Sequence, residues 1–312
     1  MIWLSWRQQR TETVIVLFVF AIAVAFLVPT GLHIASVYDD QGIAQCLAHP
    51  DGCGQTLGEF TTRWDSLVNL VAWFNLVPLI IGVLLATPLV LEFERGTHRL
   101  VWTQSVTRGR WLGVRMGFIG LGALASGLAL TALMTWWRIP LDKVDSRLGE
   151  GFDFEGIAPT VYTLFAAALV VALGVALRRT ATAIGIAVVA FLVLRIGILG
   201  WPREHFVAPI RKTWYGAVAP DLRGAWVLTE NHGFRVAAGY PNDPSIIQAC
   251  VKPPKTFDHA CMAQHHVVAY TSAVYQPASR FWLIQGIESG IFLCLTIGLV
   301  LFSIWWIRKR IS

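Results

Sequence analysis

The stretch that decides the fold runs from Ile157 to Trp201 and reads IAPTVYTLFAAALVVALGVALRRTATAIGIAVVAFLVLRIGILGW. Arg178 and Arg179 divide it into two apolar segments. Each segment is as long as a helix must be to cross the hydrocarbon core of a bilayer, which takes about 20 residues. We therefore predict two transmembrane helices here, joined by a short charged connection outside the membrane.

Four more segments of the same character lie on either side of this stretch, at residues 13–36, 65–91, 111–137 and 281–307. Together with 157–177 and 180–201 they predict an all-α membrane protein with six transmembrane helices. The composition agrees, because 55% of the 312 residues are hydrophobic and only 14% are charged. These values exclude an ordinary soluble enzyme and a disordered chain.

Positive charge gathers on one side of the six predicted helices. Basic residues flank the helix ends on that side, at Arg7 and Arg10, Arg95 to Arg110, Arg178 and Arg179, and Arg308 to Arg310, whereas the loops 37–67 and 138–156 are acidic. Because Lys and Arg mark cytoplasmic loops, both termini are predicted to be cytoplasmic. The net charge of +6 is then an orientation signal, and it does not indicate a nucleic-acid partner.

The segments divide the chain into four predicted parts. Residues 1–10 form an interfacial elbow helix, residues 11–201 hold the first five transmembrane helices with a cytoplasmic connection at 92–110, residues 202–280 form an extracellular domain, and residues 281–312 form the last helix and a basic cytoplasmic tail. The extracellular part is too long for an unstructured loop. We expect strands at 225–228 and 265–274 and a helical stretch at 209–215.

Four of the five cysteines lie in the predicted extracellular segments, as Cys46, Cys53, Cys250 and Cys261. An even number on the oxidising side predicts two disulfides. Three pairings are possible, and we favour the local one because closing a short loop requires no docking of separate loops. The spacing within each pair does not fit the C-x2-C to C-x4-C pairs of a zinc site, so no metal site is predicted.

Polar residues inside the predicted helices are candidates for function, because burying them in lipid is expensive. Arg195 lies six residues before Trp201, and Glu288 lies seven residues after Phe281. Their similar depth, shared by Asn75, permits an ion pair between the fifth and sixth helices. Two readings remain open: a polar outer vestibule on the path of an amphipathic substrate, or a structural pair that joins two helices.

Small residues four positions apart mark where helices can approach each other closely. Such pairs are Gly113 and Gly117, Gly122 and Ser126, and Gly286 and Gly290. We expect them to pack helices within one subunit, with a dimer face as the alternative.

The connection between the second and third helices, LEFERGTHRLVWTQSVTRGR at residues 91–110, is too polar to lie in the membrane and too short to be a domain. Gly96 can end one helix and Thr97 can N-cap a short amphipathic one. Leu100 and Gln104 then share one face, with Trp102 and Val106 beside it. Such a helix suits the groove of a cytoplasmic partner, although a surface loop resting on lipid headgroups is the alternative.

This connection resembles the E-x-G-T…(T/P)-V-(S/T)-R motif of ABC-2 type transporter permeases, in the residues Glu94-Arg95-Gly96-Thr97, Leu100 and Thr103-Gln104-Ser105-Val106-Thr107-Arg108. The longer run GTHRLVWTQSVTRGRW is similar to the actinobacterial branch of that family, which implies a bacterial plasma membrane. Both chain ends are similar to the same branch, in Trp3-Leu4-Ser5-Trp6-Arg7-Gln8 and Tyr275-Gln276-Pro277-Ala278-Ser279-Arg280.

The resemblance implies a six-span permease that pairs with a second permease, as a homodimer or heterodimer, and with two copies of a cytoplasmic ABC ATPase. The residues that it assigns to ATPase coupling are Glu94, Gly96, Thr97, Leu100, Trp102, Thr103, Gln104, Val106 and Arg108. ATP and Mg²⁺ would bind the partner ATPase, because this chain contains no G-x-x-x-x-G-K-[ST] loop. We expect no enzymatic activity and no cofactor in this chain.

The predicted function is export of an amphipathic small molecule, peptide or lipid. One alternative is a membrane receptor or scaffold whose external part senses a ligand. A less favoured alternative is an intramembrane lipid-modifying enzyme, which needs clustered acids, histidines or serines at one depth, whereas the spans offer chiefly Arg195 and Glu288.

Overall fold

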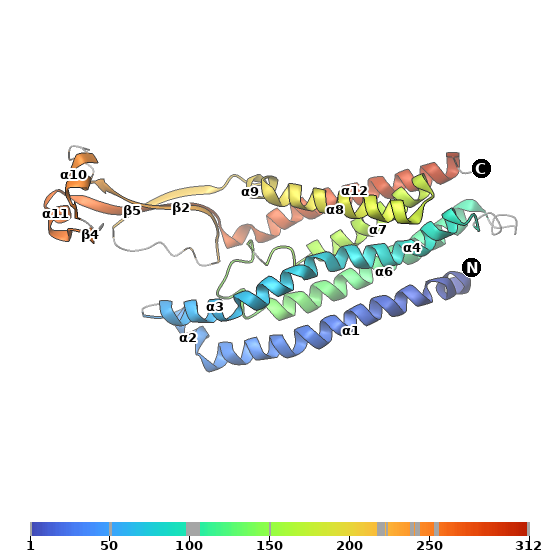
Figure 1. Ribbon diagram of the computed structural model, residues 1–312, viewed down its shortest axis with the longest axis horizontal. Helices are drawn as coiled ribbons and strands as arrows, with labels where there is room; N and C mark the ends of the chain where they lie inside the picture. Colours follow the sequence, from blue (N-terminus) through green and yellow to red (C-terminus); the bar gives the residue numbers. More distant parts are fainter. Residues whose placement is uncertain are drawn as a thin grey trace.

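The computed structural model describes residues 2–49, 52–97, 107–149, 151–216, 224–237, 244–252 and 256–310, together with Leu222 and Tyr240. Within these residues, six helices are long and apolar enough to cross a membrane, which confirms the predicted fold class. They form an elongated bundle, and a narrow β-structure projects from one end of it (Figure 1). Both chain termini lie at the opposite end. We call the two ends the sheet end and the terminus end.

The spanning helices are α1 (Ile2–Asp40), α4 (Val77–Glu94), α6 (Arg108–Arg138), α7 (Ala158–Leu177), α8 (Thr180–Gly200) and α12 (Phe281–Arg310). The second span begins before α4, with α3 (Gly54–Val71) and the 3₁₀ segment η1 (Ala72–Leu76). Helix α7 is the centre of the bundle, because it is buried along most of its length and packs against α4, α6, α8 and α12. Helix α1 lies at the edge, against α6 and α4.

Glycines let α7 approach its neighbours closely, but they are not the predicted ones. A β-carbon at Gly82 of α4 would lie 2.6 Å from the Ala166 side chain and 2.7 Å from the Ala167 backbone nitrogen. A β-carbon at Gly127 of α6 would lie 2.7 Å from the Thr160 Cα.

The predicted glycines behave differently. At Gly113, Gly117, Gly286 and Gly290 a β-carbon would meet no described atom within 4 Å, so the expectation of intrachain packing is wrong for these four. Only the pair of Gly122 and Ser126 contributes, since a β-carbon at Gly122 would lie 3.3 Å from the Leu85 side chain. The reason is geometric: small-residue spacing marks a surface that permits close approach, but it does not specify the neighbour.

The first predicted extracellular segment is largely helical. Helix α1 continues to Asp40, α2 covers Ile43–Ala48, and α3 then returns toward the bundle. The disulfide between Cys46 and Cys53 closes the turn between α2 and α3, as predicted. Apolar side chains of α1 and α3, such as Tyr38 and Phe60, are buried between these helices. Hydropathy marks only the lipid-spanning part of a helix, so it did not predict the amphipathic parts of α1 and α3 beyond the membrane.

The second extracellular segment folds as a three-stranded antiparallel sheet with a small tip. Its strands are β1 (Ile210–Tyr215), β2 (Trp226–Val236) and β5 (Val267–Gln276), in the order β1-β5-β2. The tip holds α10 (Pro244–Ala249), β3 (Val251–Lys252), β4 (Thr256–Phe257) and α11 (His259–Gln264). The predicted disulfide between Cys250 and Cys261 lies there.

The helical stretch expected at 209–215 is wrong, because these residues form β1. Strand β1 pairs along its whole length with β5, for instance Trp214 with Thr271. Long-range pairing therefore overrode local preference at this position. The elbow helix at 1–10 stays a prediction, since residues 2–10 continue without interruption into α1.

Candidate functional site

A buried group of charged side chains joins separate parts of the chain at the sheet end of the bundle. Arg203, in the short helix α9 (Pro202–His205), donates through Nε and Nη2 to the Glu288 carboxylate of α12, at 2.8 and 2.9 Å. The same guanidinium donates to Asp153, in the connection between α6 and α7, at 2.6 Å. The side chains of Arg203 and Glu288 are only 2% and 1% exposed, so each charge depends on its partners for compensation.

Asp153 is central to this group because it meets two arginines. Arg195 of α8 lies 2.9 Å from Asp153 through Nη2, and the Tyr162 hydroxyl of α7 lies 3.3 Å from Asp153 while donating to Glu288 at 2.5 Å. Burial alone would raise the pKa of Asp153, but the charges of Arg195 and Arg203 outweigh it and hold the pKa below its ordinary value. Asp153 is therefore ionised. We call Asp153, Tyr162, Arg195, Arg203 and Glu288 the ionic cluster.

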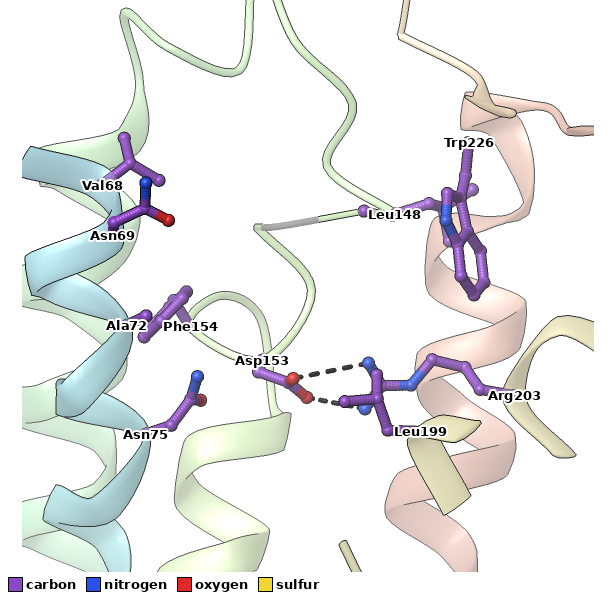
Figure 2. Close-up of a pocket in the computed structure, with 11 residues that line it drawn as sticks. Val68, Asn69, Ala72, Asn75, Leu148, Asp153, Phe154, Leu199, Arg203 and Trp226 are labelled. Carbon is purple, nitrogen blue, oxygen red and sulfur yellow. Dashed lines mark hydrogen bonds and ion pairs between the residues drawn. The ribbon is translucent and has the colours of Figure 1, made fainter. Parts of the chain in front are cut away.

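The ionic cluster borders a cavity of about 390 Å³. Figure 2 shows Asn69 and Asn75 on one side of this cavity and Asp153 and Arg203 facing them. The complete lining is Val68, Asn69, Ala72, Asn75, Leu148, Gly149, Asp153, Phe154, Leu199, Arg203 and Trp226. A smaller cavity of about 150 Å³ adjoins it, sharing Asn75, Asp153 and Leu199 and adding Arg195. Apolar walls with a few convergent polar groups suit an amphipathic molecule.

A second cluster fixes the α6–α7 connection that carries Asp153. Arg138 donates through Nε to Asp142 at 3.0 Å and to Glu155 at 3.2 Å, and Arg147 lies 2.8 Å from the other oxygen of Glu155. Burial, followed by a hydrogen bond to Glu155, raises the pKa of Asp142 to about 8. At neutral pH the Asp142 carboxyl therefore holds its proton.

Helix α12 holds the same connection in place. Gln285 donates through Nε2 to the Phe152 and Glu155 carbonyls at 3.2 and 2.8 Å, and its Oε1 accepts from the Ile157 amide at 3.1 Å. Gly156 makes this approach possible, because its φ is 62° and a side chain there would collide with Gln285. Asp153 is thus positioned by hydrogen bonds on both sides of it.

The structure brings Asn75, Arg195 and Glu288 to one region but corrects their predicted pairing. Arg195 is paired with Asp153, and Glu288 is paired with Arg203, so the expected direct ion pair between Arg195 and Glu288 is wrong. Equal depth in two helices is only one of the conditions for contact. The α6–α7 connection enters between α8 and α12 and supplies the partner that depth alone could not identify.

At the terminus end, Glu94 links two spanning helices. It is the last residue of α4, and its Oε2 accepts hydrogen bonds from the backbone N–H of Thr180, at 3.0 Å, and from the Thr180 hydroxyl. Thr180 is the first residue of α8, so the carboxylate lies at a helix N-terminus, where negative charge is stabilising. Glu94 therefore acts as an N-cap supplied by another helix.

A second contact joins the same helices at their other ends. Arg195 of α8 donates to the backbone carbonyl and the side-chain oxygen of Asn75, both at 3.4 Å, and Asn75 lies in η1 directly before α4. Helices α4 and α8 are thus tied at both ends, by Glu94 with Thr180 and by Asn75 with Arg195. We call these two contacts the α4–α8 ties.

The other predicted coupling residues are only partly described. Gly96 adopts a φ of 70° and Thr97 follows it, in the turn after α4, while Arg108 is the first residue of α6. Leu100, Trp102, Thr103, Gln104 and Val106 lie outside the described residues. The coupling helix itself stays a prediction.

Sequence reasoning missed Asp153, Tyr162 and Arg203 as members of the site. Asp153 and Arg203 stand in connections, where charged residues are ordinarily solvated, and Tyr162 is a common residue at a helix end. The available signal was the motif GFDFEG at 151–156, whose two acids alternate with aromatic residues and so are poorly suited to a solvated loop. Only the fold shows which basic residues compensate them.

The comparisons with known proteins agree with this architecture. A family model described as ABC-2 membrane transporter related matches residues 17–203. The chain belongs to this family. The matched part includes both α4–α8 ties, the α6–α7 connection and Arg203, whereas the sheet and α12 follow it. Searches of curated proteins and of solved structures gave no significant match.

Membership of the ABC-2 membrane transporter related family makes the chain a multi-pass membrane protein and a transport component. Components of this kind work with an ATPase component, as the resemblance of residues 94–108 implied. The similarity to the actinobacterial branch stays a prediction.

Proposed function

We propose that this ABC-2 family member is a permease subunit that exports an amphipathic small molecule, peptide or lipid across a bacterial plasma membrane. In this proposal, two copies of a cytoplasmic ABC ATPase bind ATP and Mg²⁺ and supply the energy. A second permease subunit, identical or related, completes the transmembrane pathway.

The observation that carries the proposal is the pair of α4–α8 ties. The connection between α4 and α6 begins directly after Glu94, so force applied there reaches α4. Glu94 in turn contacts Thr180, and Arg195 contacts Asn75 through two 3.4 Å hydrogen bonds at the far ends of the same helices. Arg195 in turn touches Asp153 beside the cavity. A movement at the terminus end is thereby connected to the ionic cluster at the sheet end.

The distribution of charge and disulfides supports the proposed orientation. Basic residues end the helices at the terminus end, including Arg178, Arg179 and Arg308, which is typical of the cytoplasmic side. Both disulfides lie toward the sheet end, and disulfides are typical of an oxidising compartment. We infer that the terminus end is cytoplasmic and that the sheet projects outside the cell.

Co-purification in mild detergent tests the proposal. We expect an ABC ATPase encoded near this chain to be recovered with it in stoichiometric amount. Leu100→Asp should abolish recovery, because a charge on the apolar face of the proposed coupling helix disrupts docking. Leu228→Asp, in the sheet that projects from the other end, is the control and should leave recovery unchanged. Failure to recover any ATPase with the intact chain would contradict the proposal.

A receptor or scaffold role is the second candidate, favoured by the sheet that extends well beyond the bundle (Figure 1). A receptor needs no ATPase, so the same co-purification separates the two functions. Deletion of the tip at 238–264 should preserve ATPase recovery if the chain is a permease subunit.

A further inference from the structure

Arg195 stands on the spanning helix that faces outward most. In the apolar part of α8 only 17% of the residues are buried, against 78% in the apolar part of α7. Apolar side chains of α8 such as Val193 and Ile196 are 63% and 66% exposed. In a membrane protein such a surface contacts lipid, so Arg195 belongs to a lipid-facing helix.

The cavity beside Arg195 opens on this same surface. Ile196 and Leu199 line it and are also 66% and 46% exposed, so they form its rim. Deeper in the cavity lie Asn75 and Asp153, which it shares with the larger cavity. The two cavities together lead from the lipid-facing side of α8 toward Trp226 at the base of the sheet. An amphiphile can therefore enter from the membrane with its chain still in lipid.

The wall of the two cavities is lined by more basic than acidic side chains. Its charged residues are Arg195, Arg203 and Asp153. Glu288, which compensates Arg203, is 1% exposed and lines neither cavity. The amides of Asn69 and Asn75 add donors. A ligand in the cavities thus meets two guanidinium groups against one carboxylate.

Arg195 makes one short and two long contacts beside the cavity. Its hydrogen bonds to Asn75 are 3.4 Å long, beyond the usual 2.7–3.2 Å of an N–H···O bond. Its short contact is with Asp153, and its guanidinium stacks on the Tyr162 ring at 4.0 Å. Among the described residues, the Nη1 donor makes only a 3.4 Å bond, to the Asn75 carbonyl, so it is available to a stronger acceptor. Carboxylate and phosphate oxygens are the acceptors that arginine binds best.

We propose that Arg195 and Asn75 form a binding site for the anionic head of an amphiphile whose hydrocarbon chain lies along α8. The head carries a carboxylate or phosphate group. Arg195 lies six residues before Trp201, so the head is drawn about 9 Å below the end of the helix, at ~1.5 Å per residue. The ligand is either a phospholipid of the surrounding leaflet or a free amphiphilic acid. This inference specifies the substrate class within the proposed export function and rests on it.

Binding to the full chain in phosphatidylcholine nanodiscs tests the site without any ATPase. The probe is radiolabelled dodecyl phosphate, with dodecyltrimethylammonium and dodecyl maltoside as competitors of the same chain length. We expect saturable binding that unlabelled dodecyl phosphate displaces and the cationic and uncharged competitors do not. Equal competition by dodecyltrimethylammonium, or the absence of saturable binding, would overturn the proposal.

Substitutions distinguish binding at this site from non-specific attraction of the probe to positive charge. Asn75→Asp places a carboxylate beside Arg195 and should weaken binding about tenfold or more, which is the order expected for losing one charge-assisted hydrogen bond. Arg195→Gln should have the same effect, and Arg195→Lys should retain part of the affinity. Arg211→Gln, an equal loss of charge on the exposed strand β1, is the matched control and should bind normally. Unchanged binding by folded Asn75→Asp protein would overturn the proposal.

A further arm distinguishes the two sources of the ligand. If a phospholipid occupies the site, nanodiscs that contain phosphatidylglycerol should bind the probe more weakly than phosphatidylcholine discs. If the ligand is a free acid, the two kinds of disc should give the same affinity. Probe binding without recovery of an ATPase would reject the export function and retain the site, and the reverse result would reject the site alone.

Discussion

The Glu94 carboxylate accepts a hydrogen bond from the Thr180 amide at 3.0 Å and so caps helix α8 from the end of helix α4. An N-cap is ordinarily supplied by the residue that precedes its own helix. Here Arg179 takes that position, and its side chain makes no capping hydrogen bond to the described residues. The cap therefore forms only while the ends of the two spanning helices are adjacent, and it is lost if they separate.

Glu94→Ala should uncouple the proposed ATPase from the membrane part without dissociating it. The substitution removes the acceptor for Thr180 but leaves the apolar face of the proposed coupling helix unchanged. We expect normal co-purification and a loss of substrate-stimulated ATP hydrolysis in proteoliposomes. Thr180→Val, which removes only the hydroxyl donor, should have a weaker effect. Glu59→Ala, an exposed acid of α3, is the control, and an equal loss there would contradict the role of Glu94.

Glu288→Gln should destabilise the protein strongly, because Arg203 then loses a charged partner in a buried site. Breaking a buried ion pair costs about 3–5 kcal/mol. A double-mutant cycle between Arg203 and Glu288, followed by thermal unfolding in detergent, should show a large coupling energy. The cycle between Arg195 and Glu288 should show a smaller one. A larger coupling energy for Arg195 with Glu288 than for Arg203 with Glu288 would instead support the ion pair predicted from the sequence.

Asp142→Asn should change how stability depends on pH. The pKa of Asp142 is about 8 in the folded protein, against a reference value of 3.8, so the folded state holds the proton more tightly. The protonated Asp142 carboxyl therefore makes its full contribution to the free energy of unfolding below about pH 4. That contribution is lost as the pH rises toward 8. The asparagine side chain of the variant mimics the protonated carboxyl at every pH. The stability of the variant relative to the parent should increase by at most about 1.4 kcal/mol per pH unit over this range.

Thermal unfolding of the parent and the variant at pH 6, 7 and 8 in the same detergent measures this difference. Asp145→Asn, in the same connection, is the control and should follow the parent at each pH. A constant difference between Asp142→Asn and the parent would show that Asp142 does not titrate in this range.

Gly82→Ala should destabilise the bundle by about 1–3 kcal/mol, the usual cost of overpacking a core. The new methyl group would lie 2.7 Å from a backbone nitrogen of α7, which cannot rotate away. Gly117→Ala is the matched control, because a methyl group there meets no described atom within 4 Å. The Gly117→Ala variant should be more stable than the parent by up to about 1 kcal/mol, because alanine has a higher helix propensity than glycine. Equal destabilisation by both would contradict the close packing of α4 on α7.

Replacement of Cys250 and Cys261 by serine should loosen the tip of the sheet and leave the bundle intact. A disulfide that closes a loop of this length adds about 2–3 kcal/mol to the free energy of unfolding. The tip has only a small apolar core around Val236, Cys250, Met262 and Val267, so it depends on the bond. Limited proteolysis should cut the variant near residues 244–264. Serines at Cys46 and Cys53 are the control, since they should not increase cleavage in the tip.

Local properties of the sequence determined the spans. A segment of about 20 apolar residues crosses a bilayer whatever its neighbours are, because the membrane itself is the partner. The disulfides were predictable for a similar reason, since each pair is close in sequence and closes a short loop. The motif at residues 94–108 pointed to the family because it is continuous.

Only the tertiary structure decided the ionic cluster. Asp153, Arg195, Arg203 and Glu288 come from four separate segments, and a charge in one segment carries no record of its partner in another. Strand β1 was misjudged for the same reason, because its pairing with β5 lies about 60 residues away in the chain. Hydropathy is a sum over neighbouring residues, whereas ion pairs and strand pairing depend on which distant segments the fold brings together.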